Sequence, residues 1–118
     1  MGAQGTAIVD FGPFPGQSDA IVTVSAPGIL AGSLVEAWIE PIATSTVNGT
    51  HSADEHMIET LGVWADQSSI VPNVSFNIHM FNKTTLDEAT LTIGSLGSAI
   101  GGIGTTIYGP WQVGWVWN

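Results

Sequence analysis

Short stretches in which apolar and polar residues alternate recur along most of this chain. The clearest cover residues 6–11, 19–25, 32–41, 73–81 and 111–118. Alternation with a period of two is typical of strands that bury one face and expose the other. Turn-forming residues such as Pro27-Gly28 and Asn48-Gly49 separate the stretches. The pattern predicts an all-β protein, an antiparallel β-sandwich or jelly-roll-like domain of about six to eight short strands.

Residues 32–41 show the alternation most cleanly. Leu34, Glu36, Trp38 and Glu40 share one face, and Val35, Ala37 and Ile39 share the other. Gly32 and Pro41 supply the signals that begin and end a strand. We therefore expect this segment to be the central strand of the sheet, with Glu36 as a polar contact at a subunit boundary.

The last segment of the chain, residues 111–118, also alternates with a strict period of two. Trp111, Trp115 and Trp117 share one face with Val113. Aromatic rows of this kind bury large apolar areas, so they are more often core or interface than exposed platforms. We expect the three tryptophans to act in assembly with other subunits, and a stacking platform for sugars is the alternative.

Residues 51–65 fit two structures. Ser52 and Glu55 have the spacing of a helix capping box, and Met57, Ile58, Leu61 and Ala65 follow at helical spacing. The same residues also alternate as a strand would. Thr60, Gly62, Val63 and Trp64 are mediocre to poor helix formers in what would be the helix interior. We favour a strand for this reason.

The same segment holds the densest set of ionisable side chains, namely His51, Asp54, Glu55 and His56. Imidazole and carboxylate ligands suit zinc or manganese, which makes His51, Asp54 and His56 weak candidates for metal ligands. Their spacing matches no established metal-binding signature. We favour a polar loop whose side chains bond to backbone donors or to a neighbouring subunit, and we predict no metal, no cofactor and no catalytic residue.

The net charge of the chain limits the classes of molecule that it could bind. Ten acidic residues against a single Lys or Arg give a formal net charge of −9. This argues against binding to nucleic acid, whose phosphates are neutralised by Lys and Arg. No apolar stretch approaches the ~18 residues of a membrane span. With 44% hydrophobic residues and few charges, the surface suits a subunit that packs against copies of itself or against another protein.

Length and linkers indicate one domain covering residues 1–118, because no repeat or long linker divides the chain. The absence of cysteine excludes a disulfide framework. Residues 93–104 are rich in glycine and serine. We expect this segment to be flexible and to become ordered on a partner.

Several segments together resemble small virion proteins encoded by tailed bacteriophages and prophages. They are residues 9–16 with 18–20, residues 32–41, the sequence HSADEH at 51–56 with Glu59, and residues 109–118 ending in WVWN. The resemblance covers most of the chain except residues 65–107. It implies a structural role in the virion and no catalytic residues.

Within such a particle, an acidic β-domain suits an accessory subunit on the capsid exterior, of the decoration, cement or head-fibre kind. The expected partners are copies of this chain, as a homotrimer, and the major capsid protein or another virion protein. The expected location is the virion, assembled in the cytoplasm of the bacterial host. A tail or fibre component that binds a receptor or glycan as lectins do is the alternative.

Overall fold

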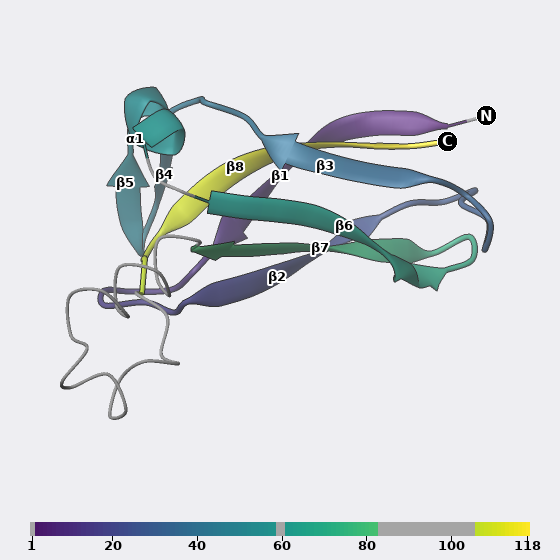
Figure 1. Cartoon of the computed structure of the whole chain (residues 1–118), viewed down its shortest axis with the longest axis horizontal. Helices are drawn as coiled ribbons and strands as arrows, with labels where there is room; N and C mark the ends of the chain where they lie inside the picture. The colour runs from purple at the N-terminus through teal and green to yellow at the C-terminus, as the bar shows by residue number, and fades with distance from the viewer. Residues whose placement is uncertain (1, 59–60, 83–105) are drawn as a thin grey trace, which may run out of the picture.

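The computed structural model describes residues 2–58, 61–82 and 106–118. This part of the chain holds eight β-strands and one short helix (Figure 1). All strand pairings among the named strands are antiparallel. The all-β prediction is therefore confirmed. Residues 83–92 and the glycine-rich segment 93–104 lie outside the described residues.

One sheet has three strands in the order β1 (Ala3–Asp10), β8 (Pro110–Trp117) and β3 (Val35–Ile39). The last strand of the chain thus lies between the first and the third, and both termini lie at the same end of the sandwich (Figure 1). The prediction that residues 32–41 form a central strand is wrong, because β3 is an edge strand and β8 is central. Alternation predicts one buried and one exposed face, and an edge strand satisfies it as well as a central one.

The second sheet has the order β2 (Asp19–Ser25), β7 (Ser75–Asn82) and β6 (Leu61–Val71). The alternation seen in the sequence at residues 19–25 and 73–81 thus lies in two paired strands. Along β7, Phe76, Ile78 and Met80 are fully buried, whereas Asn77 and His79 between them are only partly covered.

The two sheets pack face to face and form the sandwich. Val9 and Val113 from the first sheet belong to one buried cluster with Phe76, Ile78 and Met80 from the second. Between the sheets, the rings of Trp115 and Phe76 meet edge to face with centroids 5.8 Å apart. Burial of these apolar side chains is the main force that holds the sheets together.

Residues 42–58 form a small unit at one end of the sandwich. It consists of the hairpin β4 (Thr44–Thr46) and β5 (Gly49–His51), followed by the helix α1 (Ala53–Ile58) (Figure 1). The turn predicted at Asn48-Gly49 lies at the end of this hairpin, where Val47 and Asn48 form the tip and Gly49, the first residue of β5, has a φ of 150°. Glycine adopts such a φ without the steric cost that a side chain would bring.

The strand favoured for residues 51–65 is wrong over α1 and right from Leu61 onward, where β6 begins. The capping box favours a helix over a strand at this position, because it satisfies backbone N–H groups of the first helical turn. In a strand, those groups would need partners on a neighbouring strand. Gly62, Val63 and Trp64 are poor helix formers and lie in β6.

Candidate functional site

The capping box at the start of α1 is fully formed. The backbone N–H of Glu55 donates to Oγ of Ser52 over 3.1 Å, and the backbone N–H of Ser52 donates to Oε1 of Glu55 over 2.8 Å. The second of these bonds, followed by a bond from His51, holds the pKa of Glu55 below its ordinary value. Of the four ionisable residues predicted to form a polar cluster, Glu55 is thus held by the cap, and it also contacts His51 through its other carboxylate oxygen.

His51 is a buried link between β5 and the chain before β8. Its imidazole is stacked on the indole of Trp111, with centroids 4.0 Å apart. Nε2 lies 2.6 Å from the carbonyl oxygen of Tyr108, and Nδ1 lies 3.2 Å from Oε2 of Glu55. Both ring nitrogens are thus engaged with this chain, and the ring is only 3% exposed.

His56 is buried in the same way and is 2% exposed. Nδ1 lies 2.8 Å from the carbonyl oxygen of Ser52, and Nε2 accepts a bond from the backbone N–H of Gln112 over 3.0 Å. Neither His51 nor His56 has a ring nitrogen left over for a metal, and Asp54 is exposed on α1. Among the described residues, no three His, Asp or Glu side chains are grouped so as to hold a metal ion.

The tryptophans of β8 occupy the core of this chain. Trp111 is 2% exposed and Trp117 is 6% exposed, and Trp115 packs against the same cluster. Trp111 and Trp117, which were predicted to contact other subunits, are thus largely covered within their own chain, and the ring of Trp111 stacks on the ring of His51. The same burial removes the row as a sugar platform.

The outer face of β3 carries the exposed aromatic and acidic groups instead. The ring of Trp38 rests over Gly114 of β8, where an added Cβ would lie 2.5 Å from the indole Nε1. Trp38 is still 43% exposed. Glu36 is exposed, and Glu40 is half-buried, where Nε2 of Gln112 donates to its Oε1 over 2.8 Å. An indole with a free face thus lies between two carboxylates.

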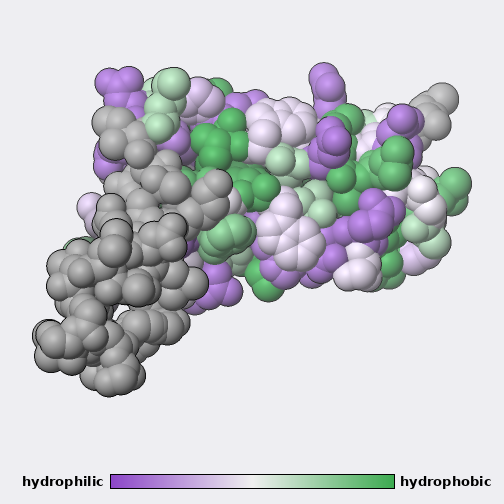
Figure 2. All heavy atoms as spheres, in the orientation of Figure 1, coloured by the Kyte–Doolittle hydropathy of each residue, from purple (hydrophilic) through white to green (hydrophobic). Residues whose placement is uncertain are grey.

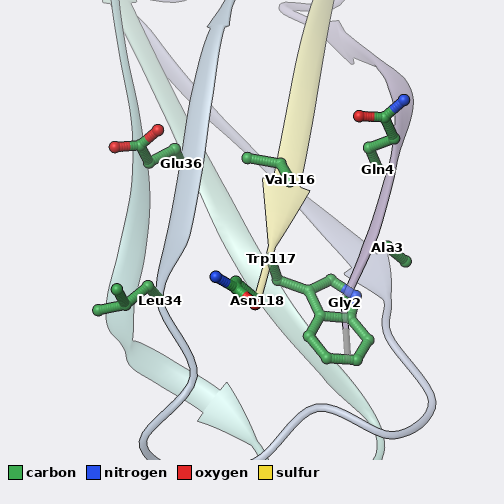
Figure 3. A pocket seen from close by; sticks show the side chains of 8 residues that line it. All are labelled: Gly2, Ala3, Gln4, Leu34, Glu36, Val116, Trp117 and Asn118. Atoms are coloured by element: carbon green, nitrogen blue, oxygen red, sulfur yellow. The ribbon is translucent and has the colours of Figure 1, made fainter.

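A hollow of about 520 Å³ adjoins Glu36 on the outer face of the first sheet. Leu34 and Glu36 of the β3 segment, Val116 of β8 and Gln4 of β1 border it (Figure 3). Leu34 is 67% exposed, so the rim of this hollow is partly apolar. The shape leaves room for a side chain or a small group beside the Glu36 carboxylate.

Between β3 and β6 lies an open seam where the two sheets contact each other without sharing strand pairing. A hollow of about 480 Å³ follows this seam, and Trp38, Trp64 and Phe81 line it. The rings are 43%, 46% and 37% exposed, respectively. Figure 2 shows hydrophobic and weakly polar side chains gathered in the middle of this face, where β3 and β6 run. Exposed apolar patches are typical of surfaces that contact other molecules.

Trp64 is held in place from below. Its indole stacks on the imidazole of His79 at 4.4 Å between centroids, and Nε2 of His79 lies 3.2 Å from Oδ2 of Asp66. Bonds from Ser68, followed by the bond from His79, hold the pKa of Asp66 below its ordinary value. The seam is therefore a preformed surface rather than a set of loose side chains.

Sequence reasoning missed this seam because Trp38 and Trp64 lie 26 positions apart in separate sheets. The signal that was present is the alternation Leu34, Glu36, Trp38, Glu40, which places an indole on the polar face of a strand. A large aromatic ring on that face indicates either an edge covered by another protein or a platform for a ligand.

No protein-family model, no curated protein and no solved structure matches this chain. Within the described part of the chain, no helix has the length and apolar character needed to cross a membrane.

Proposed function

We propose that this protein is a structural subunit of a tailed-bacteriophage particle, located on the capsid exterior, and that it stabilises the particle through protein–protein contacts rather than chemistry. The observation that carries the proposal is the exposed aromatic seam of Trp38, Trp64 and Phe81. Its burial by another protein would supply hydrophobic stabilisation in proportion to the area covered. The assignment to a phage particle rests on the resemblance of residues 32–41, 51–56 and 109–118 to small virion proteins.

The ionisable cluster of His51, Asp54, Glu55 and His56 also supports a structural role. His51 and His56 bind backbone and side-chain groups of their own chain, so their rings hold α1 against β8 rather than facing a substrate. General acid–base catalysis needs a titratable group within reach of a substrate. We therefore propose that His51 and His56 stabilise the fold.

The proposed partners are copies of this chain, as a homotrimer, and the major capsid protein or another virion protein. Apolar side chains away from the seam are available for contacts between copies. Phe14 is 77% exposed, Leu30 is 68% exposed and Met57 is 73% exposed.

Imaging of purified particles tests this function directly. Particles assembled with and without this gene are compared by cryo-electron microscopy and by heating until the genome is released. We expect extra density on the capsid exterior of the wild-type particle and release at a lower temperature from the particle that lacks the protein. Wild-type particles that contain none of this polypeptide by mass spectrometry would contradict the proposal.

A second candidate is a tail or fibre component that binds glycans. It draws on the exposed indoles of Trp38 and Trp64, since sugar rings stack on such faces. Titration with glycans from the host surface would then change the tryptophan fluorescence, and the change would be lost in Trp38→Ala. Density at the tail rather than the capsid would favour this candidate.

A further inference from the structure

The outer face of β3 repeats acidic and aromatic groups at the spacing of a strand. Glu36, Trp38 and Glu40 follow one another at every second residue, so neighbouring side chains lie about 7 Å apart along this face. One face of the Trp38 ring is covered by Gly114, and the ring is 43% exposed. A flat group laid on the free face of this indole would have a carboxylate on either side.

Among the described residues, no Lys or Arg side chain lies beside the carboxylates on this face. The chain has a single Lys or Arg, Lys83, which lies outside the described residues. In the part of the chain that the structure describes, Glu36 is exposed and has neither a hydrogen bond nor an ion pair. Glu40 uses Oε1 for Gln112, which leaves its second oxygen as an acceptor.

We propose that this face, with the seam beside it, binds an arginine-bearing segment of a different protein. The guanidinium would stack on Trp38 and donate to the Glu36 carboxylate, while apolar side chains of the segment would cover Trp64 and Phe81. The inference rests on the proposed function, because it specifies the chemistry of the protein that this subunit would contact on the particle.

Charge complementarity decides between the occupants. A second copy of this chain has no arginine to place against the Glu36 and Glu40 carboxylates, so it lacks the charge that complements this face. A neutral glycan would stack on the indole but would gain little from the overall charge. Arginine combines a planar face for the ring with a fork of donors for a carboxylate, which lysine lacks.

Peptide titration tests this inference without the particle. The probe is a short peptide that alternates Arg and Gly, acetylated and amidated at its ends, and the matched controls carry Lys or the neutral isostere citrulline in place of Arg. Binding is measured by calorimetry at low and at high salt. We expect binding of the Arg peptide, weaker binding of the Lys peptide, none of the citrulline peptide, and weakening by salt.

Two variants locate the site. Glu36→Gln removes the charge of an exposed side chain without a change of shape, and Trp38→Ala removes the ring. Each is expected to weaken binding of the Arg peptide about three- to tenfold, in line with exposed cation–π contacts and charge-assisted hydrogen bonds. Asp54→Asn, which removes an equal charge from α1, should leave the affinity unchanged within about twofold, since screening limits distant charges.

Several results would overturn the inference. They are equal binding of the Arg and citrulline peptides, no binding of either, equal weakening by Asp54→Asn and Glu36→Gln, or protection of Trp38 by glycans alone. Glu36→Gln keeps the test decisive should Trp38→Ala fail to fold. Failure of the proposed function is seen separately, because absence of the protein from purified particles would leave the peptide result standing.

Discussion

The backbone N–H of Gln112 donates a 3.0 Å hydrogen bond to Nε2 of His56. The other ring nitrogen, Nδ1, lies 2.8 Å from the carbonyl oxygen of Ser52, which can only accept. Nδ1 therefore carries the proton and Nε2 is left to accept, which defines a neutral ring in a single tautomer. One imidazole thus joins the start of α1 to the central strand of the first sheet.

His56→Ala should destabilise the fold, because it leaves the part-buried N–H of Gln112 without its acceptor. An unsatisfied donor of this kind costs about 1–3 kcal/mol. Urea denaturation followed by circular dichroism measures the loss as a lower midpoint. Met57→Ala at the next position is the control, since Met57 is 73% exposed and surface substitutions usually stay within about 0.5 kcal/mol. Equal midpoints for the two variants would contradict a structural role for the His56 ring.

Two tryptophans of β8 offer a matched comparison. The indole N–H of Trp111 donates to the carbonyl oxygen of Tyr108 over 3.2 Å, whereas the buried N–H of Trp117 has no partner among the described residues. Both rings are almost fully buried. We expect Trp111→Phe to lower the free energy of unfolding by about 1 kcal/mol more than Trp117→Phe does, since only the former loses a hydrogen bond. The reverse order in denaturant titrations would refute this interpretation.

The sequence was sufficient for the strands whose two faces differ most. Phe76, Ile78 and Met80 of β7 alternate with polar residues, so both the strand and its buried face could be predicted. The role of the β8 tryptophans could not, because alternation marks a buried face without saying whether the same chain or another covers it. Only the return of residues 110–117 between β1 and β3 settles that question.

The candidate site was harder to predict for a related reason. Local spacing identified Glu36 and Trp38 on one face of a strand, but Trp64 and Phe81 reach the seam only because the sheets meet at their β3 and β6 edges. The sequence places the two histidines in one short segment, and both of their rings lie against Trp111. Their partners, Tyr108 and Gln112, lie more than 50 residues away along the chain, where no local pattern could indicate them.

Glu55 should make stability depend on pH in the acid range. Its pKa is lowered by the bond from the backbone N–H of Ser52 and then by His51. A carboxyl whose pKa is lower in the folded chain contributes fully above its ordinary value of 4.5 and loses the contribution as pH falls through the folded value. We expect the urea midpoint to fall below about pH 4.5, and to fall less steeply in Glu55→Gln.

The contribution of Glu55 to the acid dependence has to be distinguished from the contributions of other carboxyl groups. The pKa values of Asp10 and Asp66 are also below their ordinary values, so Glu55→Gln should retain part of the acid dependence. For Asp10, burial raises the pKa, but bonds from Gly12, Thr46 and Asn48 lower it further than that. Asp54→Asn is the control on the same helical turn, and its curve should run parallel to that of the wild type. Identical slopes for Glu55→Gln and the wild type would show that the cap bond does not depend on the charge.

Gly114→Ala tests whether the Trp38 platform is built as the structure shows. An added Cβ at Gly114 would lie 2.5 Å from Nε1 and 2.6 Å from Cε2 of Trp38, so the indole has to move off the central strand. We expect a loss of about 1–3 kcal/mol, as for other overpacked sites. Gly32→Ala is the control, because nothing lies within 4 Å of its added Cβ.

The same substitution in a Trp38→Ala background identifies the cause of the loss. If the ring is what the new methyl group meets, removing the ring should abolish most of the cost of Gly114→Ala, and the two changes will not be additive. An unchanged cost in the double variant would mean that the methyl group strains β8 itself. In that case Trp38 would be free to leave the sheet, and the surface between Glu36 and Glu40 would lose the rigidity on which recognition of a flat cation depends.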